Sequence, residues 1–274
     1  MRADEYRRMA DLQGRHWWFR AKRRVVREAV RVSAKDLSPP PGESDGERPV
    51  GRVLDVGCGT GSMADVEREW GTVVAMDAHL PALAFLDVAD RVTGSASALP
   101  FADRSFRAVG CFDVLYHRGI PSVEAALREI HRVCQPGGFL VVTDSAFPFL
   151  RGPHDDAVHG ARRFRLGELN RMLHETGFRV LHASYFHTVL FPAATVVRLT
   201  ERMLAGASRR GRTDDDGATA HSDLAPVPRW LNAALEAIYR VEAPLAARFR
   251  LPFGLSLMTI AQRTADAERR IPNG

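Results

Sequence analysis

Three glycines follow a carboxylate at alternate positions in residues 55–61, Asp-Val-Gly-Cys-Gly-Thr-Gly. Glycine permits a tight backbone turn and lets a ligand lie against bare main chain. Residues 52–56 form a run typical of a buried strand, and residues 62–70 are predicted to open a helix whose free N–H groups face the same ligand. This order of strand, glycine turn and helix predicts a nucleotide-type site at the edge of a parallel sheet.

The spacing of the glycines and the position of two aspartates indicate which nucleotide binds. A dinucleotide-binding turn has the pattern G-x-G-x-x-G, whereas the Gly57-x-Gly59-x-Gly61 pattern is one residue shorter. Asp55 would repel a pyrophosphate but suits a cationic group such as an ammonium. Asp77, at the end of a second predicted strand, suits the two ribose hydroxyls with either ligand. The pattern favours a nucleoside that carries an amino-acid arm.

The elements that position these residues alternate between strands and helices from Gly51 onward. Such alternation predicts a parallel sheet covered by helices on both faces. Strands are predicted at residues 52–56, 72–76, 91–93, 108–112, 139–143, 180–186 and 254–262, further helices at 81–89, 122–133 and 166–176, and a turn at 135–138. The predicted organisation is a cap helix at 1–35, a flexible linker at 36–50, a core at 51–186, a largely helical insertion at 187–253, a closing strand at 254–263 and a loose tail at 264–274.

The N-terminal segment is predicted to be helical over residues 2–33, with an interruption at Gly14. It contains His16-Trp17-Trp18-Phe19, and three adjacent aromatic side chains cannot all face one core. The helix either packs on the sheet or forms a lid over a bound ligand, in which case Trp17 and Trp18 contact the substrate.

Composition is ordinary for a globular protein, with 45% hydrophobic and 26% charged residues in a chain of 274. The net charge of +5 is carried mainly by arginines, so with the abundant alanine it partly reflects coding bias and is not evidence for nucleic-acid binding. Three cysteines, an odd number within apolar runs, predict reduced thiols. The charged N-terminus does not resemble a signal peptide, and the apolar residues 186–199 are too short to span a bilayer. A soluble cytoplasmic protein is expected.

Several motifs in order resemble those of the class I S-adenosylmethionine-dependent methyltransferases. They are residues 53–61, Asp77, Ala98-Leu99-Pro100-Phe101 and residues 132–138, Arg-Val-Cys-Gln-Pro-Gly-Gly, and the resemblance covers about residues 51–186. His16-Trp17-Trp18-Phe19 resembles the N-terminal helix signature of a bacterial small-molecule subgroup. The resemblance implies a Rossmann-like, seven-stranded, mostly parallel sheet whose last strand is antiparallel beside the fifth. It also implies methyl transfer from S-adenosylmethionine to an oxygen, nitrogen or carbon of a small metabolite.

The resemblance also implies roles for individual residues. Asp55 and the three glycines, Gly57, Gly59 and Gly61, would hold the methionine arm, and Asp77 would bind the ribose. Ala96 would lie along the adenine, although Ser95 stands where many relatives carry an aspartate. Phe112 and Asp113 would pack beside the methionine arm, and the alternative for Asp113 is a helix cap.

Three side chains near the ends of predicted strands are candidates for the chemistry. Methyl transfer from a sulfonium is an in-line displacement that depends on alignment, with a base needed for a hydroxyl or an acidic carbon. His117 is the first candidate base, because imidazole titrates near neutrality and the residue follows the fourth strand. Tyr116 would face the acceptor, and Asp144 would orient it or accept its proton. The alternatives are a packed or helix-capping histidine and a solvated loop aspartate.

The polar loop at residues 148–164 contains further candidates. His154, Asp155 and His159 have spacings compatible with a metal, but a metal site needs three or four converging ligands, so contact with substrate is preferred and no metal is predicted. Arg163, beside Arg162, would clamp a carboxylate or phosphate, and the alternative is a pair of solvated arginines.

Nucleic acid is not the expected acceptor. Enzymes that methylate the exocyclic amines of bases usually carry an Asn or Asp-Pro-Pro-aromatic loop, and residues 111–114 read Cys-Phe-Asp-Val instead. The insertion at 187–253 would form a lid, line the acceptor pocket, build a homodimer interface or touch a membrane. The alternative functions are a non-catalytic S-adenosylmethionine-binding or partner-binding module and, less favoured, a nucleic-acid methyltransferase.

Overall fold

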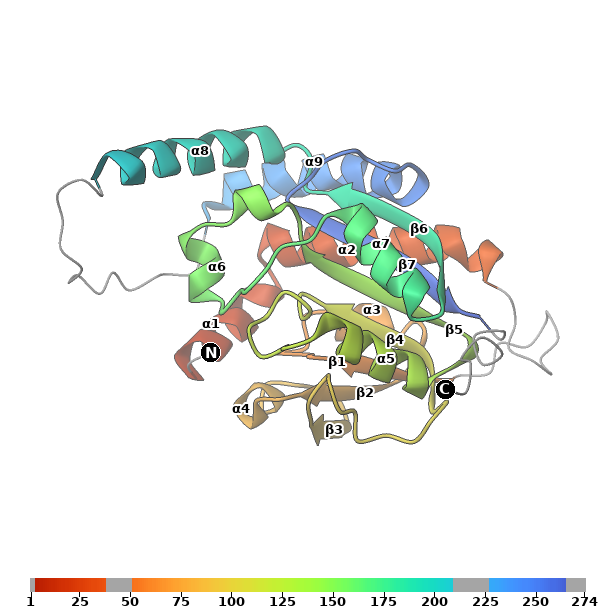
Figure 1. The fold of residues 1–274 in the computed structure, drawn as a ribbon. Coiled ribbons are helices and arrows are strands. Elements are labelled where there is room, and N and C mark those ends of the chain that lie inside the picture. Colours follow the sequence, from red (N-terminus) through yellow and green to blue (C-terminus); the bar gives the residue numbers. More distant parts are fainter. Residues whose placement is uncertain (1–2, 38–50, 209–226, 265–274) are drawn as a thin grey trace.

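The computed structural model describes residues 3–37, 51–208 and 227–264, which form one seven-stranded sheet with helices on both faces (Figure 1). The strand order is β3-β2-β1-β4-β5-β7-β6; the first five are parallel, and β7 is antiparallel to both of its neighbours. This confirms the predicted fold class, including the antiparallel last strand beside the fifth. Most of the linker expected at 36–50, the middle of the insertion at 209–226 and the tail at 265–274 lie outside the described residues.

The elements in chain order are α1 (Ala3–Gln13), α2 (Trp17–Ser33), η1 (Ala34–Asp36), β1 (Gly51–Val56), α3 (Ala64–Glu67), β2 (Gly71–Asp77), α4 (Leu80–Leu83), β3 (Asp90–Thr93), β4 (Phe106–Phe112), α5 (Val123–Val133), β5 (Cys134–Ser145), η2 (Pro148–Leu150), α6 (Pro153–Ala157), α7 (Leu166–Glu175), β6 (Phe178–Phe186), α8 (Phe191–Ser208), α9 (Arg229–Arg248) and β7 (Ser256–Arg263).

Two apolar cores lie on opposite faces of the sheet because side chains alternate along each strand. In β1, Leu54 joins the core covered by α5 and α7, whereas Val53 joins the core covered by α2, α3 and α9. Val25 and Val26 of α2 are fully buried in that second core. The C-terminal half of α2 is therefore a permanent layer of the fold, and its N-terminal half supplies the residues placed to cover a ligand.

Several predicted elements differ from those observed. The helix expected at 62–70 is observed only as the four-residue α3. It ends early because the following residues form tighter i→i+3 hydrogen bonds, such as Trp70 N to Glu67 O. The helix expected at 81–89 is likewise reduced to α4. The turn expected at 135–138 lies within β5, where the register with β4 shifts and Gly137 has a φ of +76°. It is a bulge in a continuous strand.

The N-terminal helices and the insertion occupy neighbouring positions. The break near Gly14 is as predicted, and α2 begins at His16, whose Nδ1 accepts a hydrogen bond from Trp18 N at 3.3 Å. Helix α9 packs along α2, and α8 lies along the upper edge in Figure 1 and projects beyond the sheet. Among the described residues, no helix combines the length and apolar character needed to cross a bilayer.

Gly254 lies between the insertion and β7, where its backbone passes very close to the backbone of Phe186. A Cβ at this position would lie 2.1 Å from Phe186 O. We expect Gly254→Ala to lower the free energy of unfolding by about 1–3 kcal/mol, as other overpacked sites do, measured by urea unfolding. Gly167→Ala is the matched control: nothing lies within 4 Å of that Cβ and the residue is in α7, so a gain of up to about 1 kcal/mol is expected. Equal effects of the two changes would contradict this packing.

Candidate functional site

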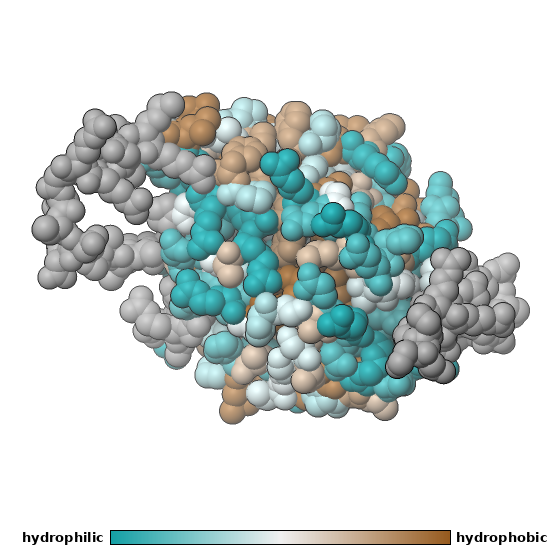
Figure 2. Space-filling model, viewed as in Figure 1, coloured by the Kyte–Doolittle hydropathy of each residue, from teal (hydrophilic) through white to brown (hydrophobic). Residues whose placement is uncertain are grey.

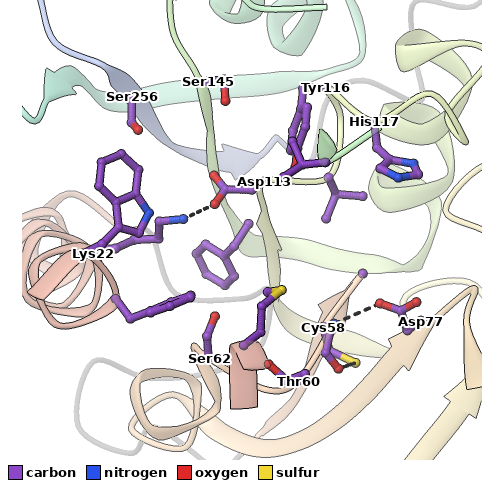
Figure 3. A pocket seen from close by; sticks show the side chains of 18 of the residues that line it. Lys22, Cys58, Thr60, Ser62, Asp77, Asp113, Tyr116, His117, Ser145 and Ser256 are labelled. Atoms are coloured by element: carbon purple, nitrogen blue, oxygen red, sulfur yellow. Dashed lines mark hydrogen bonds and ion pairs between the residues drawn. The ribbon is translucent and has the colours of Figure 1, made fainter. Parts of the chain in front are cut away.

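A cavity of about 510 Å³ opens at the carboxyl ends of the parallel strands (Figure 3). Its wall combines the turn after β1, the ends of β2, β4 and β5, both N-terminal helices and the insertion. Most of the predicted site residues line it: Trp17, Trp18, Gly57, Gly59, Asp77, Ala96, Phe112, Asp113, Tyr116, His117 and Arg163. Asp55, Gly61, Asp144, His154 and His159 are not among its lining residues.

Gly57 and Gly61 of the glycine turn admit close neighbours, while Gly57 and Gly59 line the cavity. All three glycines have positive φ, +70° at Gly57, +54° at Gly59 and +79° at Gly61. A Cβ on Gly57 would lie 2.5 Å from Val114, and one on Gly61 would lie 2.4 Å from Leu86, so these two residues admit close neighbours. A Cβ on Gly59 would meet nothing within 4 Å. Gly59 therefore leaves bare backbone facing open space, while Gly61 does not take the predicted ligand contact.

Asp77 ties this turn to the end of β2. Its Oδ2 accepts a hydrogen bond from Gly59 N at 2.9 Å and its Oδ1 accepts one from His79 N at 2.8 Å. The residue is 9% exposed and lines the cavity close to Ala96, another predicted contact. A carboxylate held this way keeps one lone pair per oxygen for a vicinal diol, as the predicted ribose contact requires.

Asp55 is directed away from the cavity, contrary to the prediction that it faces an ammonium. The alternation along β1 places its side chain on the same face as Val53, towards α3, where Glu67 is fully buried. Burial raises the pKa of Asp55 to about 7, and burial together with the charge of Asp55 raises the pKa of Glu67 well above its usual value. Among the described residues, the oxygens of Glu67 have no hydrogen-bond partner. Burial and the like charge of the neighbouring Asp55 therefore favour one proton held between the two carboxyl groups.

Helix α1 holds the glycine turn from outside. Gln13 Nε2 donates to Thr60 O at 2.9 Å, and Thr60 Oγ1 donates to Gln13 Oε1 at 2.6 Å. Tyr6 and Met9, from the same helix, line the cavity. Sequence reasoning missed these contacts, because nothing in the spacing of Gln13 pairs it with a residue 47 positions away.

The aromatic residues at the start of α2 cover the cavity and also pack on the insertion. Trp17 stacks on Tyr239 of α9, with ring centroids 5.4 Å apart, and Trp18 stacks on His187 at 4.0 Å. Trp17 N also donates to Asn232 Oδ1 at 2.8 Å. The aromatic residues of this segment thus pack on the insertion and line the cavity, and a role as a lid over a ligand stays a prediction.

Lys22 is the most notable residue that the sequence analysis missed. It is 4% exposed, lines the cavity and forms an ion pair with Asp113 (Figure 3). Thr143 Oγ1 donates to the other oxygen of Asp113 at 3.3 Å. Asp113 is thus held by a lysine and does not cap a helix. A signal was present in the sequence, because Lys22 follows Trp18 by four residues and lies on the same helical face.

The three candidates for the chemistry have different surroundings. His117 Nδ1 accepts a hydrogen bond from Gly119 N at 2.9 Å, so in the neutral ring Nε2 carries the proton and is a donor. Burial and the nearby His159 lower the pKa of His117, so its imidazole is neutral at pH 7. Burial raises the pKa of Tyr116, which keeps its hydroxyl protonated. Asp144 is fully buried and accepts from Tyr116 N at 3.1 Å and Ser145 N at 2.9 Å, so it positions the backbone and does not reach an acceptor.

The loop after β5 supplies less of the site than predicted. Arg163 lines the cavity, but its guanidinium pairs with Asp155 through bonds of 2.7 and 3.0 Å, so it has no free charge to clamp an anion. The ring of His159 lies 5.9 Å from that of His117, outside the cavity wall. His154 lies in α6, and its side chain is outside the described part. No three potential metal ligands cluster among the described residues.

Comparison with known proteins identifies relatives of part of this chain. Residues 54–142 match the family model described as a methyltransferase domain. The demethylmenaquinone methyltransferase of Renibacterium salmoninarum is 41% identical over 109 residues, which cover 38% of this chain and 45% of that protein. The enzyme of the same name from Mycolicibacterium vanbaalenii is 34% identical over 139 residues, covering 50% and 51%. The chain therefore spans about half the length of the curated relatives it matches.

Solved structures resemble the whole fold at low sequence identity. A chain from the complex between the Haloferax volcanii Trm112 methyltransferase activator and its methyltransferase has a TM-score of 0.53 at 17% identity, covering 96% of each chain. A SAM-dependent methyltransferase from Thermotoga maritima has a TM-score of 0.52 at 16% identity, covering 95% of this chain and 96% of that one. These likenesses support the fold alone.

The shared proton of Asp55 and Glu67 makes a prediction about stability. Both pKa values are higher in the folded chain than in an unfolded one, so folding takes up protons and the free energy of unfolding should fall as pH rises from about 4 towards 7. Glu67→Gln removes one titrating group and supplies an amide donor for Asp55. We expect this variant to exceed the wild type in stability at pH 8, with a smaller slope, in urea unfolding series. Glu175→Gln, an exposed control, should keep the wild-type slope; a shared slope in all three proteins would contradict the shared proton.

Proposed function

We propose that this chain, whose residues 54–142 form a methyltransferase domain, transfers a methyl group from S-adenosylmethionine to an oxygen, nitrogen or carbon of a small molecule. The observation that carries the proposal is the backbone at Gly59, which faces open space in the cavity directly beside Asp77. Bare main chain next to a buried carboxylate at the end of β2 fits a nucleoside with an amino-acid arm.

The described residues fit this cofactor, which supplies a methyl group on a sulfonium when bound. Asp77 would accept hydrogen bonds from the ribose hydroxyls, and Ala96 would lie against the adenine. Gly57 and Gly59 would lie along the methionine arm, with Phe112 beside it. The Lys22–Asp113 pair offers both a cation for the carboxylate and an anion for the ammonium of an amino acid.

His117 is proposed as the base that takes a proton from the acceptor. Its lowered pKa keeps the ring neutral, and because Nδ1 accepts from Gly119 N, the ring proton lies on Nε2. Acting as the base therefore requires Nδ1 to exchange its bond with Gly119 N for the proton of the acceptor. Tyr116 would donate a hydrogen bond to the acceptor, and Trp17 and Trp18 would exclude water from the reacting groups.

The insertion is proposed to form one wall of the acceptor pocket, because Leu190, Ala194 and Arg198 line the cavity. These residues and the N-terminal helices lie outside residues 54–142. Demethylmenaquinone, the acceptor in the names of the relatives, is therefore one compound to test among other small molecules. A cytoplasmic location is proposed from the three buried, unpaired cysteines.

Cofactor binding tests the proposed site directly. We expect wild-type protein to bind S-adenosylmethionine in isothermal titration calorimetry, and Gly59→Val to weaken binding about tenfold or more, because its side chain fills the open space and strains a backbone with positive φ. Asp77→Ala should weaken it similarly through loss of the diol contact. Gly167→Ala, a glycine change far from the cavity, should bind as the wild type does. Absence of binding by the wild type, or full binding by Gly59→Val, would exclude this site.

The role of His117 is tested by turnover at a series of pH values. With an acceptor found by screening, His117→Ala should lose about 10²–10⁴-fold in turnover while keeping its affinity for S-adenosylmethionine. Activity of the wild type should rise with pH through the pKa of His117, below the usual histidine value of about 6.5. His159→Ala removes a group that lowers this pKa, so its activity should begin to rise at a higher pH. Unchanged turnover in His117→Ala would remove it as the base.

A further inference from the structure

Helix α9 has an exposed apolar stripe on the side opposite to its contact with α2. Leu235, Tyr239, Ala243 and Ala246 face inward and are buried. Apolar residues also recur at spacings of three and four along the outer side, which defines one helical face. This outer stripe comprises Trp230, Ala234, Ala237, Val241, Leu245 and the following Phe249, of which Trp230 is 73%, Val241 65% and Phe249 59% exposed.

The charges beside this stripe are of one sign. Arg229, Arg240, Arg248 and, just beyond the helix, Arg250 are exposed and form no ion pair with any described residue. The two acidic residues of α9 are not available to offset them. Glu236 pairs with Arg20 at 3.0 Å, and Glu242 is buried, where it accepts a hydrogen bond from Thr188 N at 3.1 Å. The free charge of this helix is therefore entirely positive.

Helix α8 carries further exposed apolar side chains and also lines the cavity. Val196, 61% exposed, and Val197, 51% exposed, lie on its outer side, and Val189 precedes them. Ala194 and Arg198, on the other side of the same helix, line the cavity. Figure 1 places α8 and α9 along one edge of the molecule, and hydrophobic residues recur along that edge in Figure 2.

We propose that the outer faces of α8 and α9 dock on the surface of an anionic lipid bilayer. Exposed apolar side chains rimmed by unpaired arginines match the boundary between acyl chains and phosphate headgroups. A protein partner would need acidic groups to complement the same rim, whereas an anionic bilayer presents them at every headgroup. Neither helix crosses the bilayer, and the chain would lie on its surface. This surface goes beyond the methyltransferase activity and does not depend on it.

Vesicle co-sedimentation of the full chain tests this docking. We expect binding to vesicles of phosphatidylglycerol and phosphatidylcholine in equal parts, and weaker binding to phosphatidylcholine alone. The double variant Arg240→Gln/Arg248→Gln should weaken binding to the anionic vesicles roughly thirtyfold. Val241→Glu/Leu245→Glu should abolish it. The controls change comparable exposed residues on elements away from α8 and α9: Arg128→Gln/Arg171→Gln on α5 and α7, and Leu80→Glu on α4. All variants should unfold at wild-type temperatures.

Three outcomes would overturn the proposal. One is a wild-type chain that remains in solution with anionic vesicles. Another is an equal loss of binding in the control variants, which would indicate attraction by overall charge alone. The third is a dimer in size-exclusion chromatography with light scattering that Val241→Glu/Leu245→Glu disrupts while vesicle binding is absent, because the face would then belong to a second copy.

Discussion

The turn between β1 and α3 is held by hydrogen bonds from β2 and from α1, and the shape of the cavity depends on its position. Met76 O, at the end of β2, accepts hydrogen bonds from both Gly57 N and Cys58 N, at 2.7 and 3.0 Å. Asp77 then holds Gly59 N, and Gln13 holds Thr60 from the opposite side. The three positive φ angles of this turn would strain most residues, whereas glycine adopts them readily. The strand ends therefore present a rigid surface of bare main chain, and binding a ligand there requires little further ordering.

Two pairs of titratable groups lie near this turn, and they differ in how negative charge is compensated. Asp55 and Glu67 are buried without a cation, and one proton shared between them prevents two uncompensated negative charges. Asp113 lies on the cavity wall and forms an ion pair with Lys22. The first pair belongs to the packing beneath the turn. The second presents opposite charges to the cavity, which suits a zwitterionic arm.

The sequence predicted the sheet well because its signals are local. Apolar runs ending in Asp55 or Asp77 mark parallel strands, and they identify the edge at which the cavity forms. Strand periodicity places Asp55 on the opposite face of the sheet from Leu54 and Val56, the face that α3 covers. Individual side-chain pairings were not predictable, whether within one loop or between distant segments. The guanidinium of Arg163 is paired with the carboxylate of Asp155, and Lys22 is paired with Asp113, 91 positions away. The spacing of these residues in the sequence does not predict either pairing.

The helix pair α2–α9 links the cavity to the outer surface. Its inner side fixes Trp17 against Tyr239, and the first two turns of α2 place Trp18 and Lys22 in the cavity wall. Its outer side carries the apolar stripe and the unpaired arginines of α9. Helix α9 packs as one unit along α2. A substitution that shifts α9 along α2 would therefore alter both the cavity wall and the outer face proposed to dock. Residues 54–142, which match the methyltransferase-domain model, contain neither helix, so the part of the cavity wall that α2 supplies and the outer face of α9 both lie in segments outside that match.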